Sequence, residues 1–359
     1  MATTPRRNRR PSLETGRSTG WEQKGGIVGL PLPHGKLLVS LPAQLRHGRW
    51  VRVKKLGYRQ QRTLAATSMV RGIGLLSGQP VRLRFRPAPP DTGLVFIRTD
   101  LRPARYIPAR ASLVTDTLRR TTLGELPIQV TLVEHVLAAL AGLQVDNCYI
   151  ELDAPEPPGV DGSAREFVLA LQAAGYCEQN ARRPIWTVRS PCTVRHGNAT
   201  LSLQPSSELS IQYRLDYGLG APLPRQRAQL TVTPDSFIQE LSACRTFVLE
   251  DEIMGLHAQG IGQHITPADI LVFGAHGLGG NNLRYDNEPA RHKALDLVGD
   301  LALFGRDIRG KLIAIRSGHR LNVELVLTLL RRLADQRPAA ARLRGFHGLP
   351  ARKRLGCGG

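Results

Sequence analysis

The stretch PARHKALDLVGDLALF, residues 289–304, is the most informative segment of this 359-residue sequence. His292, Asp296 and Asp300 recur every four residues in an otherwise apolar run, and spacing of four places side chains on one face of a helix. Pro289 stands where a helix start favours proline, so a helix is predicted over the whole stretch. A His-x-x-x-Asp pair can offer nitrogen and oxygen ligands to one zinc ion, but it also occurs as an ordinary helix-face pair. The spacing alone leaves both interpretations open.

From residue 61 onward, strand-like runs alternate with helical ones, which indicates an α+β protein rather than a helical bundle. The two halves of the chain repeat the same order of elements across a junction at 182–185, although no residue-level repeat is visible. We therefore expect domain I over residues 61–185 and domain II over 186–335. Helices are expected near residues 132–141, 164–174, 236–241, 289–304 and from 322, and strands near 81–85, 94–98, 148–152, 200–203, 209–215 and 312–315.

The charge of the chain is concentrated at its ends. The sequence is 42% hydrophobic and 22% charged, which suffices for a large core, and its net charge of +20 invites a nucleic-acid interpretation. However, residues 1–60 carry 13 Lys/Arg against 2 Asp/Glu, a net of +11, and residues 331–359 carry 8 against 1, a net of +7. We expect residues 1–60 to be a disordered basic extension and 336–359 a basic tail. Both could contact phosphates or a membrane surface transiently, whereas the nearly neutral body predicts no specific nucleic acid.

Cysteine usage and hydropathy bear on the compartment. The five cysteines, at positions 148, 177, 192, 244 and 357, include no C-x-x-C pair, which argues against a disulfide framework and favours a reducing compartment. The sequence has no apolar run of about 18 residues and no secretory core behind its N-terminus. We expect a soluble, cytoplasmic protein.

A second candidate group is the pair Glu134-His135 at the start of the helix near 132–141. Thr131 and Glu134 have the spacing of a capping box, in which Glu134 would only accept from the N-cap amide, and His135 could be a core histidine. The functional interpretation is that His135 is a third metal ligand and Glu134 a general base. Three protein ligands and one open position are typical of catalytic zinc.

Two further segments could supply polar groups. His319 follows a predicted strand in the turn Ser317-Gly318-His319, where it could be simply a surface histidine. If it lay beside Asp300, the carboxylate would raise its pKa and keep it protonated to donate a proton to a leaving amine. Thr246, in Arg245-Thr246-Phe247, offers a hydroxyl donor, although a lone threonine is usually a strand residue.

Taken in order, these motifs resemble the zinc-dependent UDP-3-O-acyl-N-acetylglucosamine deacetylases, which commit lipid A synthesis in Gram-negative bacteria. The resemblance runs from about residue 61 to 333. Eight blocks carry it: QRTL (61–64), GIGLLSG (72–78), RPAPPDTGLVFIRTDL (86–101), VEHVLAALAGLQVDN (133–147), DGSAREF (161–167), RTF (245–247), RHKALDLVGDLALFG (291–305) and SGHRLN (317–322).

The resemblance implies that His135, His292 and Asp296 ligate zinc, although iron(II) also suits such ligands. It implies that Glu134 is the base that activates water. Four further roles are implied by the same blocks: Thr246 as an oxyanion donor, His319 oriented by Asp300 as the charged imidazole, and Lys293 and Phe247 in contact with substrate.

The family fold implied for this chain is a sandwich of two similar β-α-α-β-type domains, packed through their helices and each with a small insert. The second insert would fall at about 249–284, and an apolar passage would hold the acyl chain. The implied reaction is hydrolysis of the N-acetyl group of a small UDP-linked acylated glucosamine by a monomeric enzyme. Two alternatives remain at this point: a zinc deacetylase of another acylated amino sugar, and a basic nucleic-acid-binding protein that uses its tails.

Overall fold

The computed structural model describes residues 52–258, 260–266 and 269–336, so the predictions for residues 1–51 and 337–359 lie outside the described residues. Its first strand, β1 (Val53–Leu64), begins before residue 61, so the expectation of disorder is wrong for residues 53–60. This strand pairs antiparallel with β9 (Tyr176–Val188) along almost its whole length. Hydrogen bonds to β9 satisfy the backbone N–H and C=O groups of β1. The polar side chains of residues 53–60 gave no indication of a strand.

The first half of the chain builds a five-stranded sheet in the order β2-β3-β8-β4-β5. Neighbouring strands are antiparallel except β4 and β8, which run parallel because a helix separates them in the sequence. One face of β3 is buried in strict alternation, as expected for a sheet covered on one side. The strands are β2 (Ser68–Ile73), β3 (Pro80–Pro87), β4 (Leu94–Arg98), β5 (Arg105–Pro108) and β8 (Cys148–Leu152).

The second half repeats this topology. Its sheet has the order β10-β11-β18-β12-β13, again with a single parallel pair, β12 and β18, at the corresponding position. The repeated order of elements seen in the sequence is therefore a repeat of strand order and direction. The strands are β10 (Cys192–His196), β11 (Ala199–Gln204), β12 (Leu209–Leu215), β13 (Gln226–Thr231) and β18 (Gly310–Ile315).

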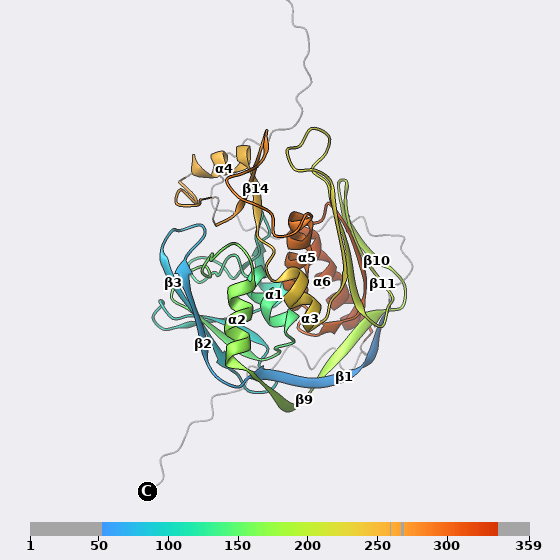
Figure 1. Cartoon of the computed structure of the whole chain (residues 1–359). Coiled ribbons are helices and arrows are strands. Elements are labelled where there is room, and N and C mark those ends of the chain that lie inside the picture. Colours follow the sequence, from blue (N-terminus) through green and yellow to red (C-terminus); the bar gives the residue numbers. More distant parts are fainter. Residues whose placement is uncertain (1–51, 259, 267–268, 337–359) are drawn as a thin grey trace, which may run out of the picture. The chain divides into compact units, whose positions relative to one another are not determined.

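Helices from both halves lie between the two sheets (Figure 1). In the first half α1 (Glu134–Gly142) and α2 (Arg165–Ala174) pack together, and in the second α5 (Glu288–Ala302) packs on α6 (His319–Asp335). The halves meet through α1 and α5 around one continuous apolar core. The α+β prediction, with two similar halves packed through their helices, is confirmed. The helix boundaries differ slightly from the prediction, since α1 starts at Glu134 and α6 at His319.

A glycine sets the closeness of α1 and α5. A Cβ atom at Gly299 would lie 2.1 Å from the backbone oxygen of Glu134 and 3.1 Å from the nitrogen of Ala138. Only glycine permits the backbones of the two helices to approach this closely. The contact therefore fixes the first turn of α1 against the C-terminal part of α5.

Each half also carries an insert before its first long helix. The first insert contains a 3-10 turn (Ala111–Leu113) and the short hairpin of β6 (Val114–Asp116) and β7 (Thr122–Leu123). In the second half, α3 (Pro234–Ser236) and a π-helical turn (Phe237–Leu241) stand in place of the single helix predicted at 236–241. The second insert, expected at about 249–284, follows them with β14 (Phe247–Leu249), α4 (Glu250–His257), β15 (Leu271–Gly274) and β16 (Gly277–Gly279).

The paired strands β1 and β9 connect the two halves (Figure 1). The short β17 (Asp307–Ile308) extends their sheet by pairing with β9. Among the described residues, no helix combines the length and the apolar character needed to cross a membrane. The four cysteines of this part of the chain, Cys148, Cys177, Cys192 and Cys244, are all free thiols.

Candidate metal centre and active site

The first turns of α1 and the middle of α5 bring three predicted ligands together. One ligand atom each of His135, His292 and Asp296 can be chosen so that all three lie within 4.8 Å of one another. Nε2 of His135 lies 3.5 Å from Oδ1 of Asp296, and Nε2 of His292 lies 3.3 Å from the same oxygen. The spacing of four puts His292 and Asp296 on one face of α5, and the contact at Gly299 brings α1 and His135 to that face.

The hydrogen bonds around these groups leave atoms free to bind a cation. Nδ1 of His292 lies 3.0 Å from the backbone oxygen of Cys244 and must donate to it, because a carbonyl only accepts. Burial lowers the pKa of His292 to about 4, so the ring is neutral and its Nε2 lone pair faces Asp296. Oδ1 of Asp296 is buried and has no hydrogen-bond partner among the described residues. A buried carboxylate oxygen without a donor is costly unless a cation binds it, so these residues fit a metal.

Asp296 also makes an ion pair inside its own helix. Its Oδ2 accepts from Nζ of Lys293 at 2.6 Å. Burial opposes the charge of Lys293, but Asp296 outweighs it and raises the pKa of that ammonium. Burial likewise opposes the charge of Asp296, yet the positively charged Lys293 and His319 hold its pKa well below the usual range. Asp296 is therefore an anion, and Lys293 a cation, at the centre of the site.

Glu134 does not cap its helix. Its carboxylate is 2% exposed, and Oε2 accepts from the backbone N–H of Thr121 at 3.0 Å. Thr131, the expected capping partner, instead shares a 2.9 Å hydrogen bond with the hydroxyl of Thr122, and α1 has no side-chain cap. The capping-box interpretation is wrong because the first insert supplies the donor. Burial raises the pKa of Glu134.

His319 and Asp300 form a buried pair, so the alternative of a surface histidine is wrong. Nδ1 of His319 lies 2.8 Å from Oδ2 of Asp300, and the side chain of His319 is 4% exposed. Burial alone would lower the pKa of His319, but the Asp300 carboxylate raises it to about 9. Nε2 of His319 lies 3.7 Å from Oδ2 of Asp296. The unbound nitrogen of a protonated imidazole thus faces the three candidate ligands.

Aromatic rings border the site on the side of the second insert. The ring of Phe247, in β14, meets the ring of His292 edge-on with centroids 6.3 Å apart, and the ring of Tyr217 also packs against Phe247, with centroids 6.1 Å apart. The half-buried Thr246 precedes Phe247, and its backbone is held by Gly162 and Leu271. Its hydroxyl makes no hydrogen bond to other described residues, so the structure brings Phe247 to the site but gives Thr246 no partner there.

Thr121 is the residue that sequence reasoning missed. Besides its N–H contact with Glu134, its hydroxyl donates to Oδ1 of Asp300 at 2.6 Å and lies 3.3 Å from Nδ1 of His319. It stands in the first insert, in a Thr-Thr pair with no periodic or motif signal. The Nδ2 amide of Asn322 also donates to Asp300, at 2.9 Å, although the sequence marked Asn322 only as part of a helix.

Comparison with known proteins matches most of the described chain. The family model "LpxC: UDP-3-O-acyl N-acetylglycosamine deacetylase" matches residues 61–331. Curated proteins named UDP-3-O-acyl-N-acetylglucosamine deacetylase are similar over most of their length. That of Marinobacter nauticus is 41% identical over 75% of this chain and 90% of its own. The relative from Hahella chejuensis is 39% identical over 76% of this chain and 90% of its own length. The relative from an Anaeromyxobacter species is 38% identical over 84% of this chain and 98% of its own length.

Proposed function

The chain belongs to the UDP-3-O-acyl N-acetylglycosamine deacetylase family, and we propose that the buried groups around His135, His292 and Asp296 carry out its hydrolysis. The reaction is removal of the N-acetyl group from UDP-3-O-acyl-N-acetylglucosamine, the committed step of lipid A biosynthesis. Its products are UDP-3-O-acyl-glucosamine and acetate. We also place the enzyme in the cytoplasm, where its free thiols stay reduced.

His135, His292 and Asp296 would hold the metal. Two imidazole nitrogens and one carboxylate oxygen suit Zn²⁺ best, and the same ligands also accept Fe²⁺. When bound, such an ion polarises the amide carbonyl and makes a neighbouring water more acidic. The observation that carries this assignment is the buried Oδ1 of Asp296, which faces two imidazole nitrogens and lacks a donor.

The remaining groups divide the proton transfers between them. Glu134, held by the N–H of Thr121, takes a proton from the attacking water. His319, charged beside Asp300, gives a proton to the nitrogen as the C–N bond of the amide breaks. Lys293 stabilises the oxygen that becomes negative, and Thr246 adds a hydroxyl donor there once substrate is bound. An acid and a base in separate environments allow both transfers at one pH.

An apolar region beside His135 would receive the acyl chain. A narrow hollow there is lined by Leu75, Leu132, His135, Pro157, Pro158, Gly159 and Phe167. Leu75 also packs against a small apolar cluster of Val248, Ile253 and Ile270 in the second insert. A continuous apolar wall from the metal ligands to the insert suits a hydrocarbon chain. Phe247, which packs on His292, would contact the sugar end of the substrate.

Two variants of the full-length enzyme test the assignment. His292→Ala removes a ligand, so we expect loss of bound metal, measured by elemental analysis, together with loss of acetate release. Glu134→Gln keeps the ligands, so bound metal should remain while the rate falls by about 100-fold or more. A Glu134→Gln enzyme with an undiminished rate, or a His292→Ala protein with full metal content, would contradict the proposed roles.

A further inference from the structure

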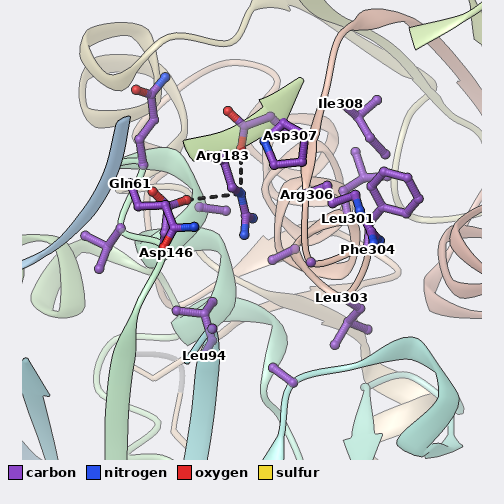
Figure 2. A pocket seen from close by; sticks show the side chains of 18 of the residues that line it. Gln61, Leu94, Asp146, Arg183, Leu301, Leu303, Phe304, Arg306, Asp307 and Ile308 are labelled. Carbon is purple, nitrogen blue, oxygen red and sulfur yellow. Dashed lines mark hydrogen bonds and ion pairs between the residues drawn. The ribbon is translucent and has the colours of Figure 1, made fainter. Parts of the chain in front are cut away.

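A second cavity lies at the opposite end of the two central helices. It has a volume of about 600 Å³, within the range of small-molecule sites, and it opens between the ends of α1 and α5 and the strands β1 and β9 (Figure 2). Leu301, which lines it, is nine residues after His292 in α5. At 1.5 Å per residue this separation is about 14 Å along the helix. None of the proposed catalytic groups lines this cavity.

Two arginines in the cavity are already paired with carboxylates. Arg59 binds Asp146 and Asp307 with contacts of 2.6 to 3.0 Å, and Arg183 directs its Nε to the same two residues at 3.2 and 3.1 Å. These four charges cancel. The terminal nitrogens of Arg183 make no hydrogen bond to other described residues, and the guanidinium extends into the cavity (Figure 2).

The remaining charge of the cavity is positive. Arg110, Arg182 and Arg309 line it, and none of them has a carboxylate partner within the described part of the chain. Among the described residues of the lining, Asp91 is the one further acidic residue, and it accepts a hydrogen bond from the side-chain amide of Gln61 at 2.7 Å. An excess of guanidinium groups around a concave surface favours a ligand with a doubly charged, planar or tetrahedral anionic group.

The opposite wall of the cavity is largely apolar. Figure 2 shows Leu301, Leu303, Phe304 and Ile308 together on the side formed by the end of α5, with Leu94 across from them. Arg306 lies on the same side, where its guanidinium packs on the ring of Phe304. A bare inorganic ion would leave this wall in contact with water. A molecule that combines an anionic group with an apolar body would satisfy both walls.

We propose that this cavity is a binding site, separate from the catalytic centre, for a phosphate monoester with an apolar body. The phosphate would lie among Arg110, Arg309 and the terminal nitrogens of Arg183, and the body would lie on Leu301 and Leu303. The chain's own ends are poor alternative occupants, because residues 1–51 and 337–359 are themselves strongly basic.

Calorimetric titration of the full-length protein with 1-naphthyl phosphate tests the site. We expect saturable binding of 1-naphthyl phosphate. Uncharged 1-naphthol lacks the anionic group and bare pyrophosphate lacks the apolar body, so each should bind at least about tenfold more weakly. Arg110→Gln combined with Arg309→Gln should weaken binding at least about tenfold. Ala302→Phe, which adds a ring to the lining and keeps every charge, should abolish it.

Two controls separate this site from others. Arg195→Gln, on the exposed edge strand β10, should leave binding unchanged, which excludes a general effect of surface charge. Lys293→Met should also leave it unchanged, which excludes phosphate binding at the catalytic centre. The proposal is overturned if the probe does not bind at millimolar concentration, or if it binds the folded double arginine variant as tightly as the original protein. Full affinity in a folded Ala302→Phe variant would overturn it equally.

Discussion

Replacing Thr121 with valine removes one hydroxyl from the centre of the polar network and keeps the shape of the side chain. Thr121 and Asp300 are both completely buried, and Asp300 receives three donors: the Thr121 hydroxyl at 2.6 Å, His319 at 2.8 Å and Asn322 at 2.9 Å. The variant loses the shortest of these. A hydrogen bond to a charged group contributes about 1.5–3 kcal/mol, and water cannot reach Asp300 to replace it. The backbone N–H that holds Glu134 is unaffected.

We therefore expect Thr121→Val to lower the free energy of unfolding by about 1.5–3 kcal/mol in urea titrations. Because Asp300 orients His319, kcat should also fall, by about 4- to 13-fold if half of that energy is lost in the transition state, while KM stays nearly constant. Because Thr121 is buried away from solvent, a fall in kcat without a change in KM indicates that it positions the pair of Asp300 and His319.

Two matched variants make this test decisive. Thr121→Ser keeps the hydroxyl and should restore most of kcat. Thr122→Val is the same change at the neighbouring position, where the hydroxyl pairs only with the neutral Thr131. It should cost about 1 kcal/mol of stability and leave kcat unchanged. If Thr121→Val has the same free energy of unfolding and the same kcat as the original enzyme, Thr121 does not position the Asp300–His319 pair.

Three further outcomes are expected. Gly299→Ala places a Cβ against the backbone of Glu134 and should destabilise the protein by about 1–3 kcal/mol while lowering kcat. Arg245→Met leaves the fully buried Glu288 without its ion pair, and thermal and urea unfolding should show a loss of about 3–5 kcal/mol. Removing the metal with a chelator should lower the unfolding temperature as well as abolish acetate release, because a ligand that binds only the folded state stabilises it.

The controls for these outcomes come from the same chain. Gly255, in α4, has nothing within 4 Å of an added Cβ, so Gly255→Ala should not destabilise the protein. The pair of Arg291 and Glu240, 3.1 Å apart, is partly exposed, and Arg291→Met should cost less than about 1 kcal/mol. Equal losses in Arg245→Met and Arg291→Met would contradict the importance given to the buried pair. An unfolding temperature that chelation does not change would contradict a metal bound by the native fold.

The sequence predicts the parts of the site that lie within one helix. Spacing of four in α5 placed His292, Asp296 and Asp300 on one face, and the structure shows all three buried together. The arrival of His135 and Glu134 beside them depends on how α1 crosses α5, which no local pattern encodes. The resemblance to a family, rather than spacing, joined these two segments.

Other features could not be predicted because long-range contacts decide them. The Thr131 to Glu134 spacing correctly marked a helix start, but the N–H of Thr121, ten residues earlier, reaches the carboxylate instead. Likewise, the charged residues 53–60 form a strand because β9 pairs with them. In both cases a partner distant in sequence outweighs the local preference.

The repeated topology explains why the candidate ligands come from corresponding elements. In each half, four strands and an insert precede a long helix, α1 or α5, and the central strand of the sheet, β8 or β18, comes after that helix. In the second half the short β17 lies between α5 and β18. Such a repeat presents two equivalent helices to each other, so their contact is a place where both halves can contribute polar groups to an enclosed site. The groups need not repeat in sequence, because α1 supplies His135 and Glu134 near its start whereas α5 supplies His292 and Asp296 further along. What the contact requires is a small residue at the crossing point, and Gly299 meets that requirement.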